Sequence, residues 1–110
     1  MSERFWIQDF ETGIDRLRVH FTIEHGQVET IRVIQYEAYL GGQWRAIVRF
    51  DEAHGFFHRD VLSPSGEQEK IVEPAEDKGL ALTQAIEDIR RYWRSYRKTY
   101  EDKYDAQTKT

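Results

Sequence analysis

The sequence predicts an α+β fold, in which an antiparallel four- to five-stranded meander sheet carries one long C-terminal helix packed on one face. Two patterns predict it. As far as Val72, apolar and polar residues alternate in short runs separated by turn-forming residues, as in strands with one buried face. After Pro74 the apolar residues recur every three or four positions, which is the spacing of one helix face. The length of 110 residues is typical of one domain, so we expect residues 1–110 to form a single domain.

The β meander is expected over residues 16–72, after an irregular N-terminal segment at residues 1–13. Its clearest strand covers residues 16–24, where the odd-numbered residues are apolar and the even-numbered ones polar. Gly41 and Gly42 predict a tight hairpin turn, because glycine adopts positive φ without strain. Further strands are expected at residues 28–40, 43–51, 58–62 and 68–72.

We expect the helix over residues 79–104, with Asp77 as its N-cap and residues 105–110 as a frayed tail. The apolar stripe of this helix ends in three aromatic residues: Trp93, Tyr96 and Tyr100. Packing against the sheet is one interpretation of the stripe. A partner surface is the other, because a helix of about 25 residues is longer than a short-stranded sheet is wide. On that interpretation a homodimer or another partner forms through the C-terminal helix.

Composition excludes several classes of protein. The chain has no cysteine, which excludes disulfides and thiolate metal sites and favours a cytoplasmic location. No apolar run is long enough to cross a membrane, so no membrane partner is expected. The formal net charge of -4 argues against broad, non-specific binding to nucleic acid, although it leaves room for a local basic site. No cofactor is expected.

The chemically richest stretch covers residues 49–60, where histidines, acids and arginines are crowded together. Histidine serves as either acid or base near neutral pH, so His54 and His58 could divide these two roles in one reaction. Asp51 or Asp60 could orient one imidazole by accepting its second N–H. Phosphate would be held by basic residues of this stretch and of the first clear strand: Arg49, Arg59, Arg18 and His20. These residue types suffice for metal-independent cleavage of RNA.

Two other interpretations of the same stretch stay open. Asp51, His54 and His58 could gather around zinc or another divalent ion, which would make the protein a metal-dependent hydrolase. Alternatively, the histidines only pin a hairpin, and the protein is a non-enzymatic interaction module. Arg18 and His20 also have a plain alternative, since charges on the solvated side of an edge strand discourage aggregation.

The span from residue 44 to residue 96 resembles a small, uncharacterised bacterial domain family. The matching features are residues 48–51, 53–55, 58–60 and 85–89, together with Trp44, Gly66, Trp93 and Tyr96. More distantly, the arginine–aromatic–aspartate–x–alanine pattern of residues 49–53, followed by histidines, resembles the TumE-like toxins of bacterial toxin–antitoxin pairs. That family carries an Asn-Ala-Pro-His-His type sequence where this chain has residues 52–55. The distant resemblance to the TumE-like toxins implies a small cytoplasmic protein that is encoded beside an antitoxin and acts on RNA or translation.

The leading hypothesis is therefore a toxin-like, metal-independent ribonuclease, or an inactive relative of one. His54 and His58 would be its acid–base pair, and Asp51 would orient a histidine. Its partners would be an antitoxin and RNA. The interaction module and the metal-dependent hydrolase are the two alternatives.

Overall fold

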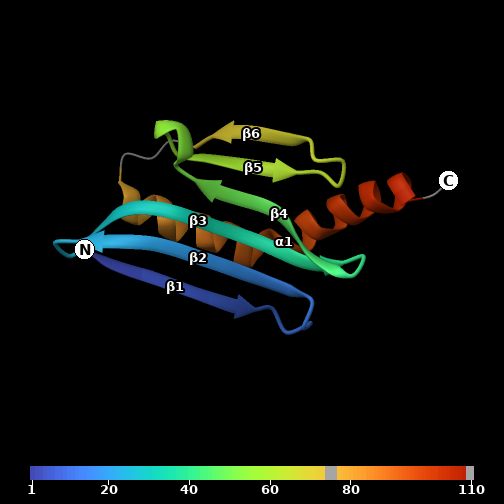
Figure 1. Cartoon of the computed structure of the whole chain (residues 1–110), viewed down its shortest axis with the longest axis horizontal. Helices are drawn as coiled ribbons and strands as arrows, with labels where there is room; N and C mark the ends of the chain where they lie inside the picture. Colours follow the sequence, from blue (N-terminus) through green and yellow to red (C-terminus); the bar gives the residue numbers. More distant parts are fainter. Residues whose placement is uncertain (74–76, 109–110) are drawn as a thin grey trace.

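The structure is a computed structural model that describes residues 1–73 and 77–108, with the side chain of His54 outside the described part. Within these residues, six strands form one antiparallel sheet in chain order, and a long helix crosses one of its faces (Figure 1). The elements are β1 (Ser2–Asp9), β2 (Asp15–Glu24), β3 (Gln27–Leu40), β4 (Gln43–Asp51), the 3-10 turn η1 (Ala53–Gly55), β5 (His58–Leu62), β6 (Gln68–Val72) and α1 (Lys78–Thr108). The predicted α+β meander with a C-terminal helix is confirmed, and the described sheet has six strands rather than four or five.

The additional strand is β1. The prediction of an irregular segment at residues 1–13 is wrong for Ser2–Asp9, which pairs with β2 along its whole length. The strand is difficult to see in the sequence because Phe5, Trp6 and Ile7 are three consecutive apolar residues. β1 lies at the edge of the sheet and most of its residues are exposed. No buried face therefore imposes a period of two on its sequence.

Gly41 and Gly42 close the β3–β4 hairpin, as predicted. Both have positive φ, of 62° and 84°, and the pair Leu40 and Gln43 flanks the turn. Gly41 also lies close to α1, because a Cβ atom on it would be 2.1 Å from the Tyr104 hydroxyl oxygen. A larger residue at position 41 would therefore displace either the turn or the last turns of the helix.

The C-terminal end of α1 extends farther than expected. The predicted helix ends at residue 104, whereas α1 continues to Thr108, so the prediction of a frayed tail at residues 105–110 is wrong for residues 105–108. Residues 109 and 110 lie outside the described part. The added turn contains no glycine or proline, and the Thr108 hydroxyl donates to the Tyr104 carbonyl at 3.0 Å. The last turns of α1 project past the sheet (Figure 1).

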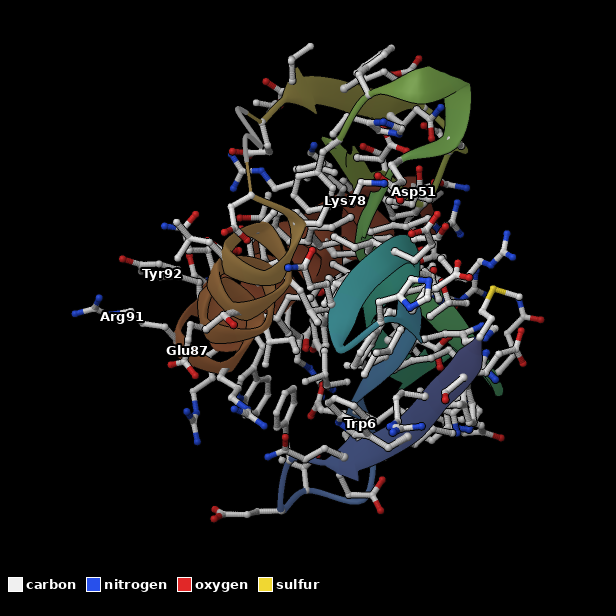
Figure 2. All side chains as sticks on the ribbon, turned by 90° about the vertical axis from the view of Figure 1, so that its left-hand side faces the viewer. Trp6, Asp51, Lys78, Glu87, Arg91 and Tyr92 are labelled. Atoms are coloured by element: carbon white, nitrogen blue, oxygen red, sulfur yellow. The ribbon has the colours of Figure 1, made fainter. Side chains whose placement is uncertain are left out.

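The N-terminal end of α1 is capped as predicted, since the Asp77 carboxylate accepts the Leu80 amide at 3.0 Å. The outer side of the helix is largely polar. Figure 2 shows Glu87, Arg91 and Tyr92 pointing away from the sheet. No helix in the described residues combines the length and the apolarity needed to cross a membrane.

The core lies between α1 and one face of the sheet, because α1 packs mainly on β3 and also on β4. The Trp93 ring stacks on the Phe10 ring, with the two ring centroids 5.2 Å apart. The centroids of the Trp93 and Tyr36 rings are 6.0 Å apart. Trp93 and Tyr100 are both buried, and Tyr96 packs partly buried against them. These three residues of the aromatic stripe therefore pack against the sheet.

Candidate functional site

The predicted motif occupies β4, η1 and β5. The pairing of β4 with β5 places Arg49 opposite Asp60 and Asp51 opposite His58. Side chains alternate along a strand, so these four residues project from one face of the sheet. Phe50, which lies between them, projects from the other face into the core. We call the face opposite α1 the open face.

His58 is the most enclosed member of this group, with 1% of its surface exposed. Its Nε2 atom lies 3.2 Å from an Asp51 carboxylate oxygen and 3.3 Å from an Asp60 carboxylate oxygen. Its Nδ1 atom lies 3.2 Å from the Phe56 carbonyl oxygen. The imidazole thereby joins β4, β5 and the segment that follows η1. A ring this enclosed is well placed to hold the hairpin in shape and poorly placed to exchange a proton with a substrate.

The donor atoms of Asp51, His58 and Asp60 all lie within 4.8 Å of one another, so these three residues could hold a metal ion. The sequence suggested Asp51, His54 and His58 instead. Because the His54 side chain lies outside the described residues, its part in a metal site or an acid–base pair stays a prediction. Asp60 joins the described cluster because side chains alternate along β5, so that Asp60 projects from the same face as His58.

A chain of polar contacts beside this cluster crosses the open face from β4 to β2. The Arg49 Nε–H donates to the Gln35 side-chain oxygen at 2.7 Å, and the Gln35 amide donates to the Glu37 carboxylate. Glu37 also accepts the Arg16 Nε–H at 2.6 Å and lies 3.5 Å from a terminal nitrogen of Arg18. The buried carboxylate of Glu37 thus compensates part of the charge of Arg16 and Arg18. The guanidinium groups of these two residues are less available to phosphate than those of isolated arginines would be.

The four predicted phosphate ligands are divided between the two faces. Arg18, His20 and Arg49 lie on the open face, as their strand pairings require. Arg59 projects from the opposite face, where its guanidinium donates to the Tyr96 hydroxyl at 2.9 Å. The structure therefore does not bring Arg59 together with Arg49 and His58.

Arg59 belongs to a fixed link between β5 and α1. The Tyr96 hydroxyl donates to Asp88 at 2.5 Å. Burial, followed by this bond to Asp88, raises the pKa of Tyr96 to about 12. Burial lowers the pKa of Arg59, but the bond to Tyr96 and the nearby carboxylates outweigh it and raise that pKa above its ordinary value. Both side chains thus keep their protons at neutral pH and hold the strand to the helix.

Sequence reasoning singled out neither Gln35 nor Glu37. Both are buried, and both lie in β3 among apolar residues that are buried as well. A charged residue inside an apolar strand is the signal that could have indicated a buried polar partner, because an unpaired buried charge is costly.

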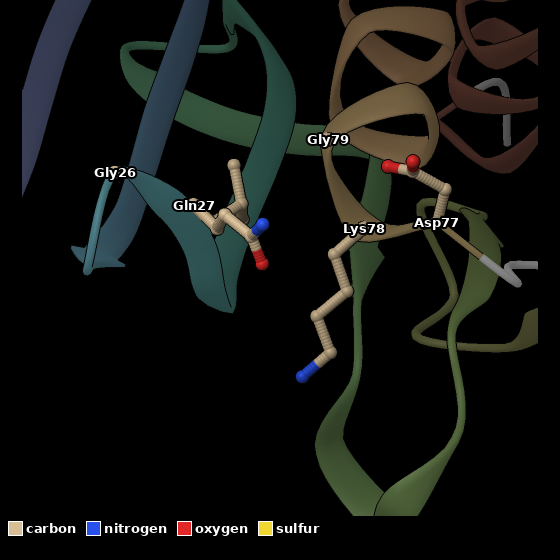
Figure 3. Close-up of a pocket in the computed structure, with 6 residues that line it drawn as sticks. Gly26, Gln27, Asp77, Lys78 and Gly79 are labelled. Carbon is tan, nitrogen blue, oxygen red and sulfur yellow. The ribbon is translucent and has the colours of Figure 1, made fainter.

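A cavity of about 490 Å³ lies between the β2–β3 turn and the start of α1, and its lining includes Gln27, Asp77 and Lys78 (Figure 3). A helix N-terminus attracts anions, but here the Asp77 carboxylate already accepts the Leu80 amide. The Lys78 ammonium group donates to the Glu29 carbonyl at 2.6 Å. The groups that would attract an anion therefore have partners within the chain.

A family model described as a domain of unknown function (DUF7718) matches residues 1–106 of the chain. The match covers all six described strands and nearly all of α1. It includes β1, the strand that the sequence pattern does not reveal. No curated protein and no solved structure matches the chain.

Proposed function

The chain belongs to the DUF7718 family, whose function is unknown, and we propose that it is a non-enzymatic interaction module that forms a homodimer through the edge of β1. The observation that carries this proposal is the exposed, apolar character of β1. Among the described residues, this strand pairs on one side only, with β2. Its outer edge presents backbone N–H and C=O groups to any strand that approaches.

β1 carries the charged residues Glu3, Arg4 and Asp9, but it lacks the other features by which proteins protect a sheet edge. It is eight residues long, contains neither lysine nor proline, and pairs with β2 without a bulge. Phe5 and Ile7 are 55% and 42% exposed and project to the open face. Trp6 projects to the side of α1 (Figure 2). A long, apolar, exposed edge strand is a template for pairing with a further strand.

The opposite edge of the sheet differs in length. β6 has five residues and β1 has eight, and both strands carry charged side chains. A short edge strand resists pairing, and β1 exposes the bulkier apolar side chains of Phe5, Trp6 and Ile7. The contrast between the two edges therefore directs association to β1.

A second copy of β1 is the partner that we favour, because its charges fit. A two-fold axis perpendicular to the sheet pairs the two strands antiparallel and keeps each side chain on its own face. With Phe5 on the axis, the two Phe5 rings pair, and Arg4 lies opposite Trp6 of the second copy. With Trp6 on the axis, Glu3 would lie opposite Asp9, and like charges directly opposite each other are destabilising. Of these two registers, the charges favour the Phe5-centred one.

Association through the C-terminal helix, either as a homodimer or with an antitoxin, is a less well supported proposal. It relies on the aromatic stripe, and Trp93 and Tyr100 are buried against the sheet. These side chains offer a partner little surface. The β1 edge offers more.

The toxin-like ribonuclease that acts on RNA in the cytoplasm is also less well supported. It requires His54 and His58 to exchange protons with a substrate while Asp51 orients a ring. His58 is enclosed by Asp51, Asp60 and the Phe56 carbonyl, so the hairpin would have to open first. In the interaction module, His58 has the simpler role of holding the β4–β5 hairpin.

Ile7→Glu tests the dimer. In the Phe5-centred register position 7 lies opposite Glu3 of the second copy, so the substitution places like charges across the interface, and we expect it to convert the dimer into a monomer. The melting temperature should change little, because Ile7 is partly exposed and its neighbour on β2 is Arg18. Size-exclusion chromatography with light scattering would give the wild-type protein twice the chain mass of 13.2 kDa. The variant would have the mass of one chain across the same dilution series.

Val72→Glu is the matched control, since Val72 is an apolar residue that is 65% exposed on the opposite edge strand. This variant should remain a dimer. A wild-type protein that stays monomeric throughout the dilution series would rule out the proposal. Dissociation by Val72→Glu but not by Ile7→Glu would place the interface at the β6 edge and contradict the proposal.

A further inference from the structure

We propose that Asp51, His58 and Asp60 form a binding site for one divalent first-row metal ion, and that zinc is the ion it fits best. The site lies on β4 and β5, away from β1, and the proposal is independent of the dimer. Its role is structural, because the ion would fasten β4 to β5. This set of ligands has Asp60 in place of His54, which the sequence pattern grouped with Asp51 and His58.

The spacing of the donor atoms is the first observation. The Nε2 atom of His58 lies 3.2 Å and 3.3 Å from its two carboxylate oxygens. Two ligands of a tetrahedral zinc ion with bonds of 2.0–2.1 Å are about 3.3 Å apart. A hydrogen bond between a charged nitrogen and a carboxylate is usually shorter, at about 2.7–2.9 Å. Both nitrogen–oxygen distances therefore match the distance between two ligands of one ion, and all three donor atoms lie within 4.8 Å of one another.

The orientation of the His58 ring is the second observation. The Phe56 carbonyl oxygen can only accept a hydrogen bond, so the Nδ1 atom that faces it at 3.2 Å carries a hydrogen. The other ring nitrogen, Nε2, faces the carboxylates of Asp51 and Asp60, so it is the atom that would bind an ion held between them. A metal-bound histidine usually has this arrangement, in which its other ring nitrogen donates to a carbonyl or carboxylate.

Asp60 supplies the third and independent observation. Its side chain is 6% exposed, and its Oδ1 atom is buried without a hydrogen-bond partner among the described residues. The Oδ2 atom of the same carboxylate faces His58, so the unpartnered oxygen lies beside the cluster. A buried carboxylate oxygen without a donor is costly, and a cation bound to the same carboxylate would offset part of that cost.

The charges in the cluster lead to the same conclusion. Asp51 and Asp60 lie within reach of one imidazole, and in the described part of the chain neither makes an ion pair with lysine or arginine. Arg49 is opposite Asp60 in the strand pairing, but its Nε–H donates to Gln35. One divalent ion would balance the two carboxylates. Two carboxylates and one imidazole suit zinc or manganese better than softer ions.

Titration of the protein with zinc alone tests the site. The full chain would be purified without a histidine tag, stripped with a chelator and titrated by calorimetry and by thermal melting. We expect one zinc ion to bind per chain and to raise the melting temperature as its concentration increases. Cobalt in place of zinc should give visible absorption bands that report on its ligands. Asp60→Asn, which keeps the shape of the side chain, should weaken zinc binding roughly tenfold or more.

The control is His20→Gln combined with His25→Gln. Both histidines lie near a surface glutamate and could hold zinc adventitiously, so this variant should bind as the wild-type protein does. Asp51→Asn replaces Asp60→Asn if the latter fails to fold, because Asp51 is the more exposed ligand. Stripped wild-type protein that takes up no zinc would overturn the proposal. So would loss of binding in the histidine control, or full binding in a folded aspartate variant.

Discussion

Asp15 has no exposed surface, although it is an acid. Its carboxylate accepts hydrogen bonds from the Tyr36 hydroxyl at 2.5 Å, from the Thr12 hydroxyl at 2.6 Å and from the Arg97 guanidinium at 2.6 Å. These bonds tie the start of β2 to β3 and α1. A carboxylate is tolerated inside a protein when it is paired and bonded this completely.

Tyr36→Phe tests this buried group. Burial, and then the bond to Asp15, raise the pKa of Tyr36 above its ordinary value of 10.0. Above pH ~10 the unfolded chain therefore releases a proton that the folded chain keeps, so the contribution of Tyr36 to stability is complete below that pH and is lost as the pH rises further. We expect the variant to lose roughly 1.5–3 kcal/mol of unfolding free energy at pH 7 and to decline less steeply at alkaline pH. Urea unfolding between neutral and alkaline pH measures both quantities.

Tyr92→Phe is the control for this substitution, because Tyr92 is exposed on α1. It should leave the unfolding free energy at pH 7 unchanged. A Tyr36→Phe protein as stable as the wild type would show that the bond to Asp15 contributes nothing measurable.

Part of the candidate site follows from the sequence by the alternation of side chains. The odd-numbered residues Arg49 and Asp51 share one face of β4, and the even-numbered residues His58 and Asp60 share one face of β5. The same rule separates Arg59 from His58, so grouping these two residues overlooked the alternation. The burial of His58 could not be predicted in the same way. It depends on strand register and on the position of the Phe56 carbonyl, which no local pattern specifies.

At the scale of elements, α1 is held to the sheet by its aromatic stripe and by polar links. Trp93 stacks on Phe10, and Tyr96 joins Arg59 to Asp88. The long helix was predictable because its apolar period persists over many residues. β1 was not, because an exposed edge strand can dispense with alternation.

Trp93→Ala distinguishes core packing from a partner surface on the helix. Trp93 is buried in the core, so we expect its truncation to lower the unfolding free energy by roughly 3–5 kcal/mol. The same variant should keep the wild-type oligomeric state, provided that it is measured well below its melting temperature. Denaturant unfolding and light scattering provide the two readouts. A stable variant that becomes monomeric would restore the helix as the interface.

At the scale of the whole molecule, one helix covers one face of the described sheet, and the other face is held by polar networks. A two-fold axis at β1 would join two such sheets into one and place both helices on the same side, because rotation about an axis perpendicular to the sheet preserves its faces. The proposed metal site on β4 and β5 is separated from β1 by β2 and β3. The dimer and the metal site can therefore be tested separately.

Cross-linking through one introduced cysteine tests the β1 dimer most directly, because the chain has no cysteine of its own. In the Phe5-centred register, the two Cβ atoms at position 5 lie about 4.5–5.5 Å apart across the strand pair, close enough for a disulfide after slight adjustment. The two positions 7 are offset by four residues, or about 13 Å. We predict that Phe5→Cys forms a disulfide-linked dimer under mild oxidation and that Ile7→Cys does not. Failure of Phe5→Cys to cross-link, or equal cross-linking of both variants, would contradict the interface.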